Sequence, residues 1–378
     1  MRYHPRPSHK DQTRANKGVP TTMMTTLTSC QRVVRAMERR DHDRVPRFDA
    51  FWDETLERWR REGLTGDPAD WFDFDIVTLG HMAPVPFPGR NEIIREDEDT
   101  VDHVNEYGAT FREWKNRSGV PEHLGFECAN PDVWQRAFKP RFDEPAVNVD
   151  AIAPAYRAAR DGSRFACLGS RGVYSFVQTM VGDLTILISM IDEPQWVSDM
   201  AATTTDAYLK MYQQVLDAGM TPDAIWIHDD LAYRNALFMS PQMYRDLFRP
   251  QHKRLVEFAH ANGMKFIFHT DGDVREVVAD MVDIGVDCLQ PMEAKANMDV
   301  RDLAPRFGDR LSLFGNIDMT VAITNDHDQV EAELRAKLGA GMAMHGYLYH
   351  SDHSVPPQVS WRTYQFIHDL VDRLGVYR

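Results

Sequence analysis

The 378-residue sequence has few cysteines and no long apolar run. The four cysteines, Cys30, Cys128, Cys167 and Cys288, are scattered and form no C-x-x-C pair. A disulfide framework is therefore not expected, and the cytoplasm is the expected location. No apolar run reaches the roughly 18 residues that a membrane span needs, so we expect no membrane association.

Positive charge is also scarce. The chain has 43 Lys and Arg against 57 Asp and Glu, which gives a formal net charge of −14. Nucleic acids and anionic membranes are bound by basic stripes, so the charge balance argues against both as partners. With 43% hydrophobic residues, the chain can still bury one large core or two modest ones.

The first residues differ from the rest of the chain. Residues 1–22, MRYHPRPSHKDQTRANKGVPTT, have no apolar periodicity and lack the apolar segment of a secretory signal. A polar stretch of this kind does not bury enough apolar surface to fold. We predict a disordered tail over residues 1–24 and a single domain over residues 25–378.

Short apolar runs alternate with helical patterns along the remaining sequence. The strand candidates are residues 44–52, 74–81, 164–172, 223–230, 265–272, 287–293, 311–318 and 347–353. Strands that alternate with helices pair in parallel, and eight such units predict an α/β fold, a closed (β/α)₈ TIM barrel. A doubly wound parallel sheet is the alternative topology.

One region breaks this alternation. Residues 92–120 carry polar, strand-like stretches with a Tyr-Gly pair at a turn. We predict a small β-hairpin or antiparallel insertion between the second and third barrel strands, within an insert of about residues 88–150.

Two predicted helices carry clear signals at their ends. The apolar face over residues 273–285 has period 3.6, and Asp273 and Glu276 stand at the spacing of a capping box. A second helix begins with Ser240 as its N-cap and should be kinked or split at Pro250.

Polar and ionisable residues gather where the predicted strands end. The C-terminal ends of barrel strands carry catalytic groups, whereas the N-terminal ends serve stability. In strand order, these residues are Trp52 and Asp53; His81; Arg171 and Tyr174; His228, Asp229, Asp230 and Tyr233; His269, Asp271 and Asp273; Glu293; Asn316 and Asp318; His350, Asp352 and His353. All except Asp229, Asp273 and His350 enter the predicted site.

Several of these residues also have simpler roles open to them. Asp318 stands where a helix cap would fit, and Tyr174 and Trp52 suit an aromatic core. Side chains alternate along a strand, so only one of Asp229 and Asp230 can face the barrel axis.

His269 and Asp271 form the most distinctive pair. They are two residues apart, so their side chains lie on the same side of the strand. A carboxylate beside an imidazole raises the pKa of the ring or holds one tautomer for metal binding. Asp352 and His353, at the end of the last strand, adjoin the first strand once the barrel closes. Together these residues predict an acid–base or metal site.

Four stretches carry a family resemblance. RVPRFDAFWDETLERWRREG (44–63), DDLAYRNALFMSPQMYRDLFRPQHKRLVEFAHANGMKFIFHTDGD (229–273), DIGVDCLQPMEAKANMDVRDLAPRFGDRLSLFGNID (283–318) and SDHSVPP (351–357) resemble the uroporphyrinogen decarboxylase (URO-D) superfamily. The resemblance extends over about residues 29–375 and implies a TIM barrel. This superfamily includes porphyrinogen decarboxylases and zinc methyltransferases that serve corrinoid proteins.

The resemblance is closer to the methyltransferase-like branch. True uroporphyrinogen decarboxylases have an MRQAGR-type stretch whose arginines bind the carboxylates of the substrate, and this chain has FWDETLERWRREG there. A mouth rimmed by Asp53, Asp230, Asp271, Glu293 and Asp352 would also repel a highly anionic substrate.

In the corrinoid-linked methyltransferases, an H-x-C motif after the fifth strand and a later cysteine hold zinc. By position, His269 keeps the histidine, Asp271 stands at the first thiolate, and Asp352 lies at or next to the second. The resemblance therefore implies a divalent metal, zinc among the candidates, held by His269, Asp271 and Asp352. Carboxylate ligands shift the preference toward harder ions.

These observations favour methyl transfer from a small methoxy or methylamine substrate to a corrinoid-binding protein. His269, Asp271, Asp230 and His353 are the predicted catalytic residues, acting with a metal or as an acid array. The alternative is a metal-free decarboxylase, in which Arg171 anchors a carboxylate. A third reading is a barrel that only binds and delivers a ligand. We expect a monomer or homodimer.

Overall fold

Seven parallel strands form the central sheet. In the computed structural model, which describes residues 27–116 and 121–377, their order is β1 (Ile76–Met82), β6 (Phe165–Arg171), β7 (Ala224–His228), β10 (Lys265–Thr270), β11 (Cys288–Pro291), β12 (Ser312–Phe314) and β13 (Tyr347–Leu348). Because neighbouring strands are parallel, their C-terminal ends lie at one end of the sheet. Seven of the predicted strands are thus confirmed, and the predicted tail over residues 1–24 lies outside the described residues.

The predicted first strand, residues 44–52, is not a regular strand. It lies beside β13 through isolated parallel bridges, Arg47 with Tyr349 and Phe51 with Val355. On its other side, the Asp75 N–H donates to the Arg47 carbonyl at 2.9 Å. Instead of the predicted closed barrel of eight strands, the chain forms a curled seven-stranded sheet whose edges this segment connects. Pro46 has no N–H to donate, which disfavours a continuous ladder here.

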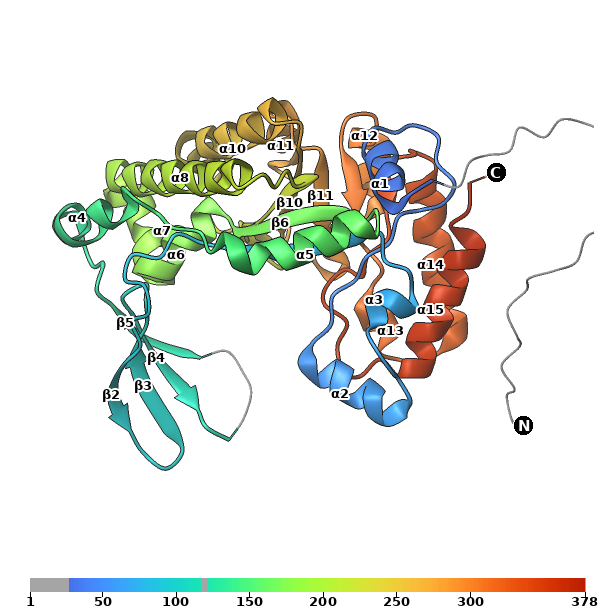
Figure 1. Cartoon of the computed structure of the whole chain (residues 1–378), viewed down its shortest axis with the longest axis horizontal. Coiled ribbons are helices and arrows are strands. Elements are labelled where there is room, and N and C mark those ends of the chain that lie inside the picture. Colours follow the sequence, from blue (N-terminus) through green and yellow to red (C-terminus); the bar gives the residue numbers. More distant parts are fainter. Residues whose placement is uncertain (1–26, 117–120, 378) are drawn as a thin grey trace, which may run out of the picture.

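Helices surround the sheet, and most of them cover its outer face (Figure 1). They are α1 (Ser29–Met37), α2 (Asp53–Glu62), α3 (Pro68–Trp71), α4 (Pro131–Val133), α5 (Val149–Asp161), α6 (Val173–Val181), α7 (Asp183–Asp192), α8 (Pro194–Asp217), α9 (Pro241–Met243), α10 (Arg249–Ala261), α11 (Val278–Asp283), α12 (Val300–Phe307), α13 (Met319–Ala322), α14 (His327–Met342) and α15 (Trp361–Leu374). α8 packs beside α10, and α14 packs beside α15.

The inner face of the curled sheet is apolar at its N-terminal end. Side chains from neighbouring strands meet there in one buried cluster, which includes Phe165, Trp226, Ile267 and Phe314. α1 packs against this cluster through Val33, Ala36 and Met37 and closes that end. Because strand side chains alternate, the next inward-facing positions along the strands lie at the opposite, C-terminal end.

The insertion between β1 and β6 is larger than the predicted hairpin. It is an antiparallel sheet of four strands in the order β2 (Glu92–Glu96), β3 (Thr100–Val104), β4 (Ala109–Trp114) and β5 (Glu122–Phe126). The sheet projects from the body of the molecule (Figure 1). β2 is exposed along its whole length, so it lacks the apolar alternation that marks a strand in sequence.

The two helices with strong end signals differ in outcome. α11 begins at Val278 rather than near Asp273, and residues 275–277 form a turn before it. Asp273 accepts a hydrogen bond from the Arg275 N–H and pairs with the Arg275 guanidinium, not with Glu276. The predicted capping box with Glu276 is therefore not formed. Ser240 caps α9 as predicted, and a π-helical turn, Tyr244–Phe248, interrupts the helix just before Pro250.

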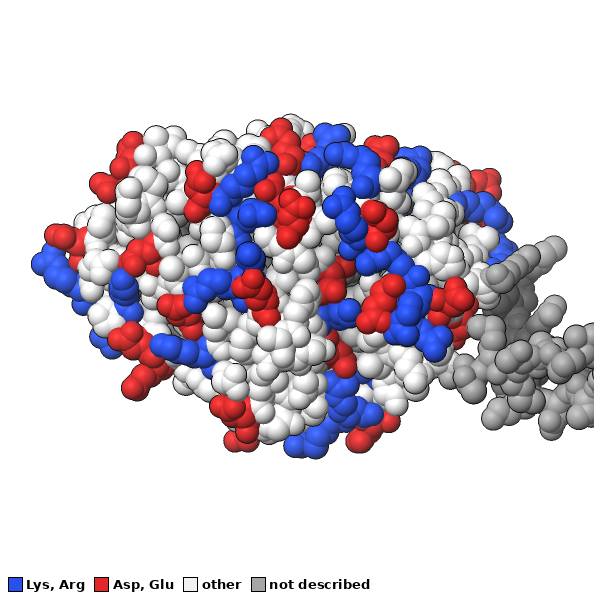
Figure 2. All heavy atoms as spheres, turned by 90° about the horizontal axis from the view of Figure 1, so that it is seen from above, with Lys and Arg blue, Asp and Glu red and all other residues white. Residues whose placement is uncertain are grey.

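The described residues contain no single helix that is long and apolar enough to cross a membrane. α6 and α7 meet that test only as a pair, and they are bent by 108° relative to each other. On the face seen in Figure 2, basic and acidic side chains alternate over short distances.

Candidate functional site

The C-terminal end of the sheet turns a row of polar side chains inward. His228 on β7, His269 on β10 and Gln290 on β11 are in parallel register, and each comes two residues after a member of the inner apolar cluster. The imidazole centroids of His228 and His269 are 4.8 Å apart. The alternation that places apolar side chains at the N-terminal end of the inner face thus places histidines at its C-terminal end, which we call the mouth.

Asp230, His269 and Asp271 form a compact group at this mouth. The Nε2 atom of His269 is 3.5 Å from Oδ1 of Asp230 and 3.8 Å from Oδ1 of Asp271. One ligand atom from each residue lies within 4.8 Å of the other two. Three atoms about 2.0–2.2 Å from one zinc ion would be roughly 3.5 Å apart, so the spacing fits a divalent cation.

The Asp271 carboxylate supports this fit. Its Oδ1 atom is buried and accepts no hydrogen bond from any described residue, whereas Oδ2 is 3.6 Å from Nε2 of His353. Burial raises the pKa of Asp271, although the nearby His269 charge works in the opposite direction. A buried carboxylate oxygen without a donor is costly unless a proton or a cation compensates it.

The turn after β10 places Asp271. Gly272 has a φ of +82°, and an added Cβ would lie 2.6 Å from the backbone of Ala232. A residue with a side chain would not fit there, so the glycine of the FHTDGD stretch is needed for this turn. The Gly272 N–H donates to Oε2 of Glu293 at 3.0 Å, which ties the turn to the end of β11.

Charge is tightly coupled within the group. Burial alone would lower the pKa of His269, but the contacts with Asp230 and Asp271 raise it to about 9. Burial would raise the pKa of Asp230, but the interaction with His269 lowers it to about 2. Without a bound cation, an imidazolium between carboxylates is therefore the stable form at neutral pH.

Asp229 and Asp230 are separated as predicted. Asp229 is fully buried, is 2.7 Å from Nε2 of His252 and accepts the backbone N–H groups of Tyr174 and Ser175 at the start of α6. Asp230 faces the mouth, and its Oδ1 accepts the Asp271 N–H at 3.0 Å.

Asp352 does not lie with the candidate metal ligands. Its carboxylate is 2% exposed and accepts the backbone N–H groups of Ala294 at 3.1 Å and Met319 at 3.0 Å. Burial raises its pKa to about 6. Asp352 thus connects the loops after β11 and β12, and Asp230 takes the place that the sequence prediction gave to Asp352.

Three other predicted residues also brace loops. Asn316 is fully buried, bonds to the carbonyls of Met292 and Met298 and accepts the Val300 N–H. Asp318 caps α13, the simpler role that its sequence position allowed. Glu293 pairs with Lys295 at 2.7 Å in addition to its bond with Gly272.

A second side of the mouth carries two neutral histidines and one arginine. The imidazoles of His81 and His228 have centroids 5.2 Å apart, and Arg171 at the end of β6 donates to Thr179. Burial lowers the pKa of His228 to about 3, with further contributions from the charges of His269 and His81. Burial and the Arg171 charge likewise lower the pKa of His81.

The predicted aromatic residues divide between the core and the surface. Tyr174 is 1% exposed and packs against Phe238 and Phe248 in the core. Trp52 is 48% exposed and stacks on His353 with centroids 6.0 Å apart, and Tyr233 on β8 (Ala232–Tyr233) is 52% exposed. Asp53, the first residue of α2, is exposed next to Trp52.

The comparison with known families places this chain. The sequence pattern of the uroporphyrinogen decarboxylase (URO-D) family matches residues 168–374, more than half of the chain. The chain belongs to the URO-D family. The matched range contains Asp230, His269 and Asp271. No curated protein matches the chain in sequence.

One of three solved structures compared with this URO-D protein has the same fold. A methyltransferase from Methanosarcina mazei superposes with a TM-score of 0.64 at 16% identity, over 92% of this chain and 98% of that one. A D-psicose 3-epimerase with D-fructose has a TM-score of 0.28 at 12% identity, over 60% and 83% of the two chains. A zinc-bound amidohydrolase from Burkholderia ambifaria has 0.30 at 11%, over 94% and 91%. The last two scores are too low to carry an argument.

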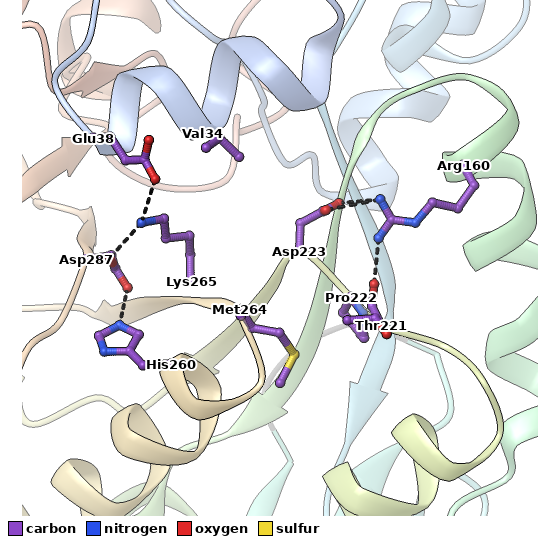
Figure 3. Close-up of a pocket in the computed structure, with 11 residues that line it drawn as sticks. Val34, Glu38, Arg160, Thr221, Pro222, Asp223, His260, Met264, Lys265 and Asp287 are labelled. Carbon is purple, nitrogen blue, oxygen red and sulfur yellow. Dashed lines mark hydrogen bonds and ion pairs between the residues drawn. The ribbon is translucent and has the colours of Figure 1, made fainter.

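A pocket of about 570 Å³ lies away from this mouth, at the N-terminal ends of β7 and β10 (Figure 3). Its ionisable side chains are paired with one another. Lys265 contacts Glu38 at 3.3 Å and Asp287 at 3.5 Å, and Arg160 contacts Asp223 at 3.0 Å. Because these charges are satisfied, and because this end of the barrel serves stability, we do not assign the reaction to it.

Sequence reasoning missed Gln290, Lys295 and the inward position of His350. Gln290 bonds to His269 at 2.5 Å, and Lys295 neutralises Glu293. Gln290 lies two residues after buried Cys288 on a short strand, and this spacing could have indicated its inward direction. Nothing in the sequence near Lys295 indicates its ion pair.

Proposed function

We propose that this URO-D protein is a methyltransferase-like enzyme. It takes a methyl group from a small methoxy or methylamine substrate at the barrel mouth and passes it to a corrinoid carried by a partner protein. The observation that carries the proposal is the convergence of Asp230, His269 and Asp271, with a buried Asp271 oxygen that lacks a donor. Methyl transfer is also an activity of a protein with this fold, the M. mazei methyltransferase.

The chemistry requires stabilisation of the group that the methyl leaves. When the C–O or C–N bond breaks, the substrate oxygen or nitrogen keeps the electron pair, and the methyl carbon bonds to the acceptor. His269, with its pKa of about 9, can donate the Nε2 proton to that oxygen or nitrogen. A positioned general acid contributes roughly 10²–10⁴-fold in rate.

Asp230, His269 and Asp271 are also the residues that would hold a divalent metal. Such an ion supplies Lewis-acid stabilisation to the departing oxygen or nitrogen. Two carboxylates and one imidazole accept zinc but also suit harder ions such as manganese. His353, 3.6 Å from Asp271, positions that carboxylate.

The surroundings of the group fit a small methylated substrate. Trp52 and Tyr233 present exposed aromatic surface, and Trp52 stacks on His353 at the edge of the group. Aromatic faces beside carboxylates bind methylammonium groups through cation–π attraction. Tyr174 is part of the core and does not contribute to this aromatic surface.

A direct assay tests the proposal. The purified protein is incubated with cob(I)alamin and a panel of methoxy-aromatic compounds and methylamines, and methylcobalamin is followed by absorbance. We expect methylcobalamin with at least one substrate, and loss of the product in His269→Gln and Asp230→Asn. His260→Gln, in the pocket at the opposite end, should retain activity. No methylcobalamin from either substrate class, with the protein folded, would refute methyl transfer.

Metal content is measured separately. We expect stoichiometric zinc or manganese in the purified protein, or a rise in its thermal midpoint when either ion is added. Asp230→Asn should reduce both effects, whereas Asp352→Asn should leave binding intact. Absence of metal binding together with an unchanged thermal midpoint would exclude the metal-assisted reaction and leave His269 as the general acid.

The second candidate is a metal-free decarboxylase for a substrate less anionic than uroporphyrinogen. The observation that favours it is Arg171, which makes no ion pair with a carboxylate in the described part of the chain and can anchor a substrate carboxylate. In this reaction the C–C bond breaks, an electron-accepting ring takes the pair, carbon dioxide leaves, and His353 or His269 protonates the carbon. Carbon dioxide release from carboxylated pyrroles, without methylcobalamin in the first assay, would favour this function.

A further inference from the structure

Behind His269, polar side chains continue into the protein as a connected row. Nδ1 of His269 is 2.5 Å from Oε1 of Gln290, and Nε2 of Gln290 is 3.5 Å from Nε2 of His350. On its other side, Nδ1 of His350 bonds to the carbonyl of Ser351 and is 3.8 Å from Oδ1 of Asp49. Gln290, His350 and Asp49 are each at most 3% exposed.

The hydrogen bond at the Ser351 end of this row fixes which atom donates and which accepts in each of its hydrogen bonds. The Ser351 carbonyl can only accept a hydrogen bond, so Nδ1 of His350 carries a proton. Neutral His350 then has an unprotonated Nε2, which accepts from the amide nitrogen of Gln290. The Gln290 oxygen therefore faces His269, and Nδ1 of His269 must be the donor. The opposite amide orientation would leave the Ser351 carbonyl against an unprotonated nitrogen.

Asp49 holds this end in place. It accepts the Ser351 N–H at 3.1 Å and Oγ–H at 2.9 Å, the Tyr364 hydroxyl at 2.7 Å and the Tyr349 hydroxyl at 3.2 Å. With four donors the carboxylate cannot rotate freely. Asp49 comes from the segment that connects the sheet edges, so the row extends from that segment through the residues just after β13 to β11 and β10.

From this geometry we propose that Gln290 and His350 are positioning residues that fix the tautomer of His269. They keep the proton on Nδ1 and leave Nε2 turned to Asp230 and Asp271. Nε2 is the atom that would bind the metal or carry the transferred proton, and in this role the inference rests on the proposed function. A hydrogen bond to the second ring nitrogen is the usual way in which proteins fix a metal-binding histidine.

Without Gln290, the surroundings of His269 would favour the other tautomer. Two carboxylates face Nε2 of His269, and alone they would attract the N–H to Nε2. Removal of the Gln290 acceptor should therefore move the proton of the neutral ring from Nδ1 to Nε2. That tautomer presents a proton to the metal position instead of a lone pair.

Nuclear magnetic resonance of ¹⁵N-histidine-labelled protein tests this without metal or substrate. Spectra are recorded in a series of increasing pH until the His269 ring is neutral, and the His269 signals are assigned by their loss in His269→Gln. We expect a protonated Nδ1 and an unprotonated Nε2 in the parent protein. Gln290→Met should reverse this pattern, and Gln290→Glu, which retains an acceptor, should restore it. His350→Phe, which frees the amide to rotate, should give a mixture.

Gln214→Met is the matched control. Gln214 is a partly buried glutamine on α8 that bonds to the backbone of Val147 and Pro145, and its loss should leave the His269 tautomer unchanged. An Nε2–H tautomer in the parent protein, or an unchanged tautomer in Gln290→Met, would overturn the proposal. If Gln290→Met does not fold, the parent and His350→Phe spectra decide.

Calorimetry with Zn²⁺ alone gives the second readout. We expect Gln290→Met to weaken binding by about 10–100-fold and Gln290→Glu to retain it. If the parent protein binds no zinc, the metal form of the proposed function fails, but the tautomer measurement still decides the role of Gln290. Equal zinc affinity in the parent and Gln290→Met would count against positioning.

Discussion

At the residue scale, the end of β7 divides two adjacent carboxylates between structure and site. Asp229 pairs with His252 in the interior and holds the start of α6, whereas Asp230 faces His269 across the mouth. Strand alternation predicted this division, because one of two successive side chains must face away. The same rule placed His269 and Asp271 together. Their catalytic roles stay predictions that the variants above test.

The role of Asp352 could not be predicted from its position in the sequence alone. Its position after the last strand agrees with a ligand role, but its partners are backbone N–H groups of two loops that are far away in sequence. Only the packed fold brings Ala294 and Met319 to that carboxylate. Gln290 was missed for the related reason that its partner, His350, is 60 positions away.

His368 gives a prediction about pH. It is 2% exposed, stacks on Phe72 with centroids 3.7 Å apart, and neither ring nitrogen has a hydrogen-bond partner among the described residues. Burial, with a smaller effect of the Arg47 charge, holds its pKa well below 6.5. Below about pH 6.5 the unfolded chain binds a proton that the native state excludes. The free energy of unfolding should therefore fall, by about 1.4 kcal/mol per pH unit from this residue.

His368→Phe should remove this contribution. Urea unfolding from about pH 5 to about pH 7 should show a shallower decline in the variant, with the curves converging in shape above about pH 6.5. The same decline in both proteins would mean that His368 takes up its proton in the native state.

At the element scale, the inserted sheet is joined to the body at Gly182, between α6 and α7. Gly182 has φ +80° and ψ 163°, and an added Cβ would lie 2.3 Å from the ring of Phe126 on β5. The insertion was underestimated in sequence because its edge strands, β2 and β5, are largely exposed and carry little apolar alternation. By contrast, the buried parallel strands were easy to recognise as apolar runs between helices.

Gly182→Ala should loosen this junction. The backbone strain costs about 1–3 kcal/mol, and the contact with Phe126 must also open. Hydrogen exchange and limited proteolysis should therefore increase in β2–β5. Gly219→Ala is the matched control, because Gly219 has φ +79° and nothing within 4 Å of the added Cβ. Phe126→Ala added to Gly182→Ala should restore part of the loss. Equal effects of the two glycine changes would exclude the contact.

At the scale of the whole molecule, the segment at residues 44–52 joins the two edges of the sheet. Buried Asp75, just before β1, accepts from Arg32 at 2.5 Å, Arg44 at 2.7 Å and the Arg47 N–H at 2.9 Å. α1 and this segment are thereby fixed to the first strand. The apolar pattern predicted a regular strand here. Pro46 has no N–H for the backbone ladder, and the Asp49 side chain takes part of the ladder's place by accepting the Ser351 N–H.

Asp75→Asn should destabilise the whole domain. Arg32 is 6% exposed, and a neutral partner leaves part of its buried charge uncompensated, so we expect a loss of about 3–5 kcal/mol in the free energy of unfolding. Asp73→Asn is the control, because Asp73 also pairs with Arg44 but its side chain is 75% exposed; it should change stability by less than about 1 kcal/mol. Urea unfolding measures the free energy of unfolding of both variants. Similar small losses would show that the two edges of the sheet stay connected without Asp75.

The segment that joins the edges also sets an order of events during synthesis. Asp49 and Tyr349, which bond across it, are 300 positions apart. Phe48 stacks on His350 and Phe51 packs against Tyr364, so both rings leave the ribosome long before these partners exist. A nascent chain arrested before β13 lacks these partners and leaves part of each ring uncovered, and such unfinished chains are the ones that aggregate or need a chaperone.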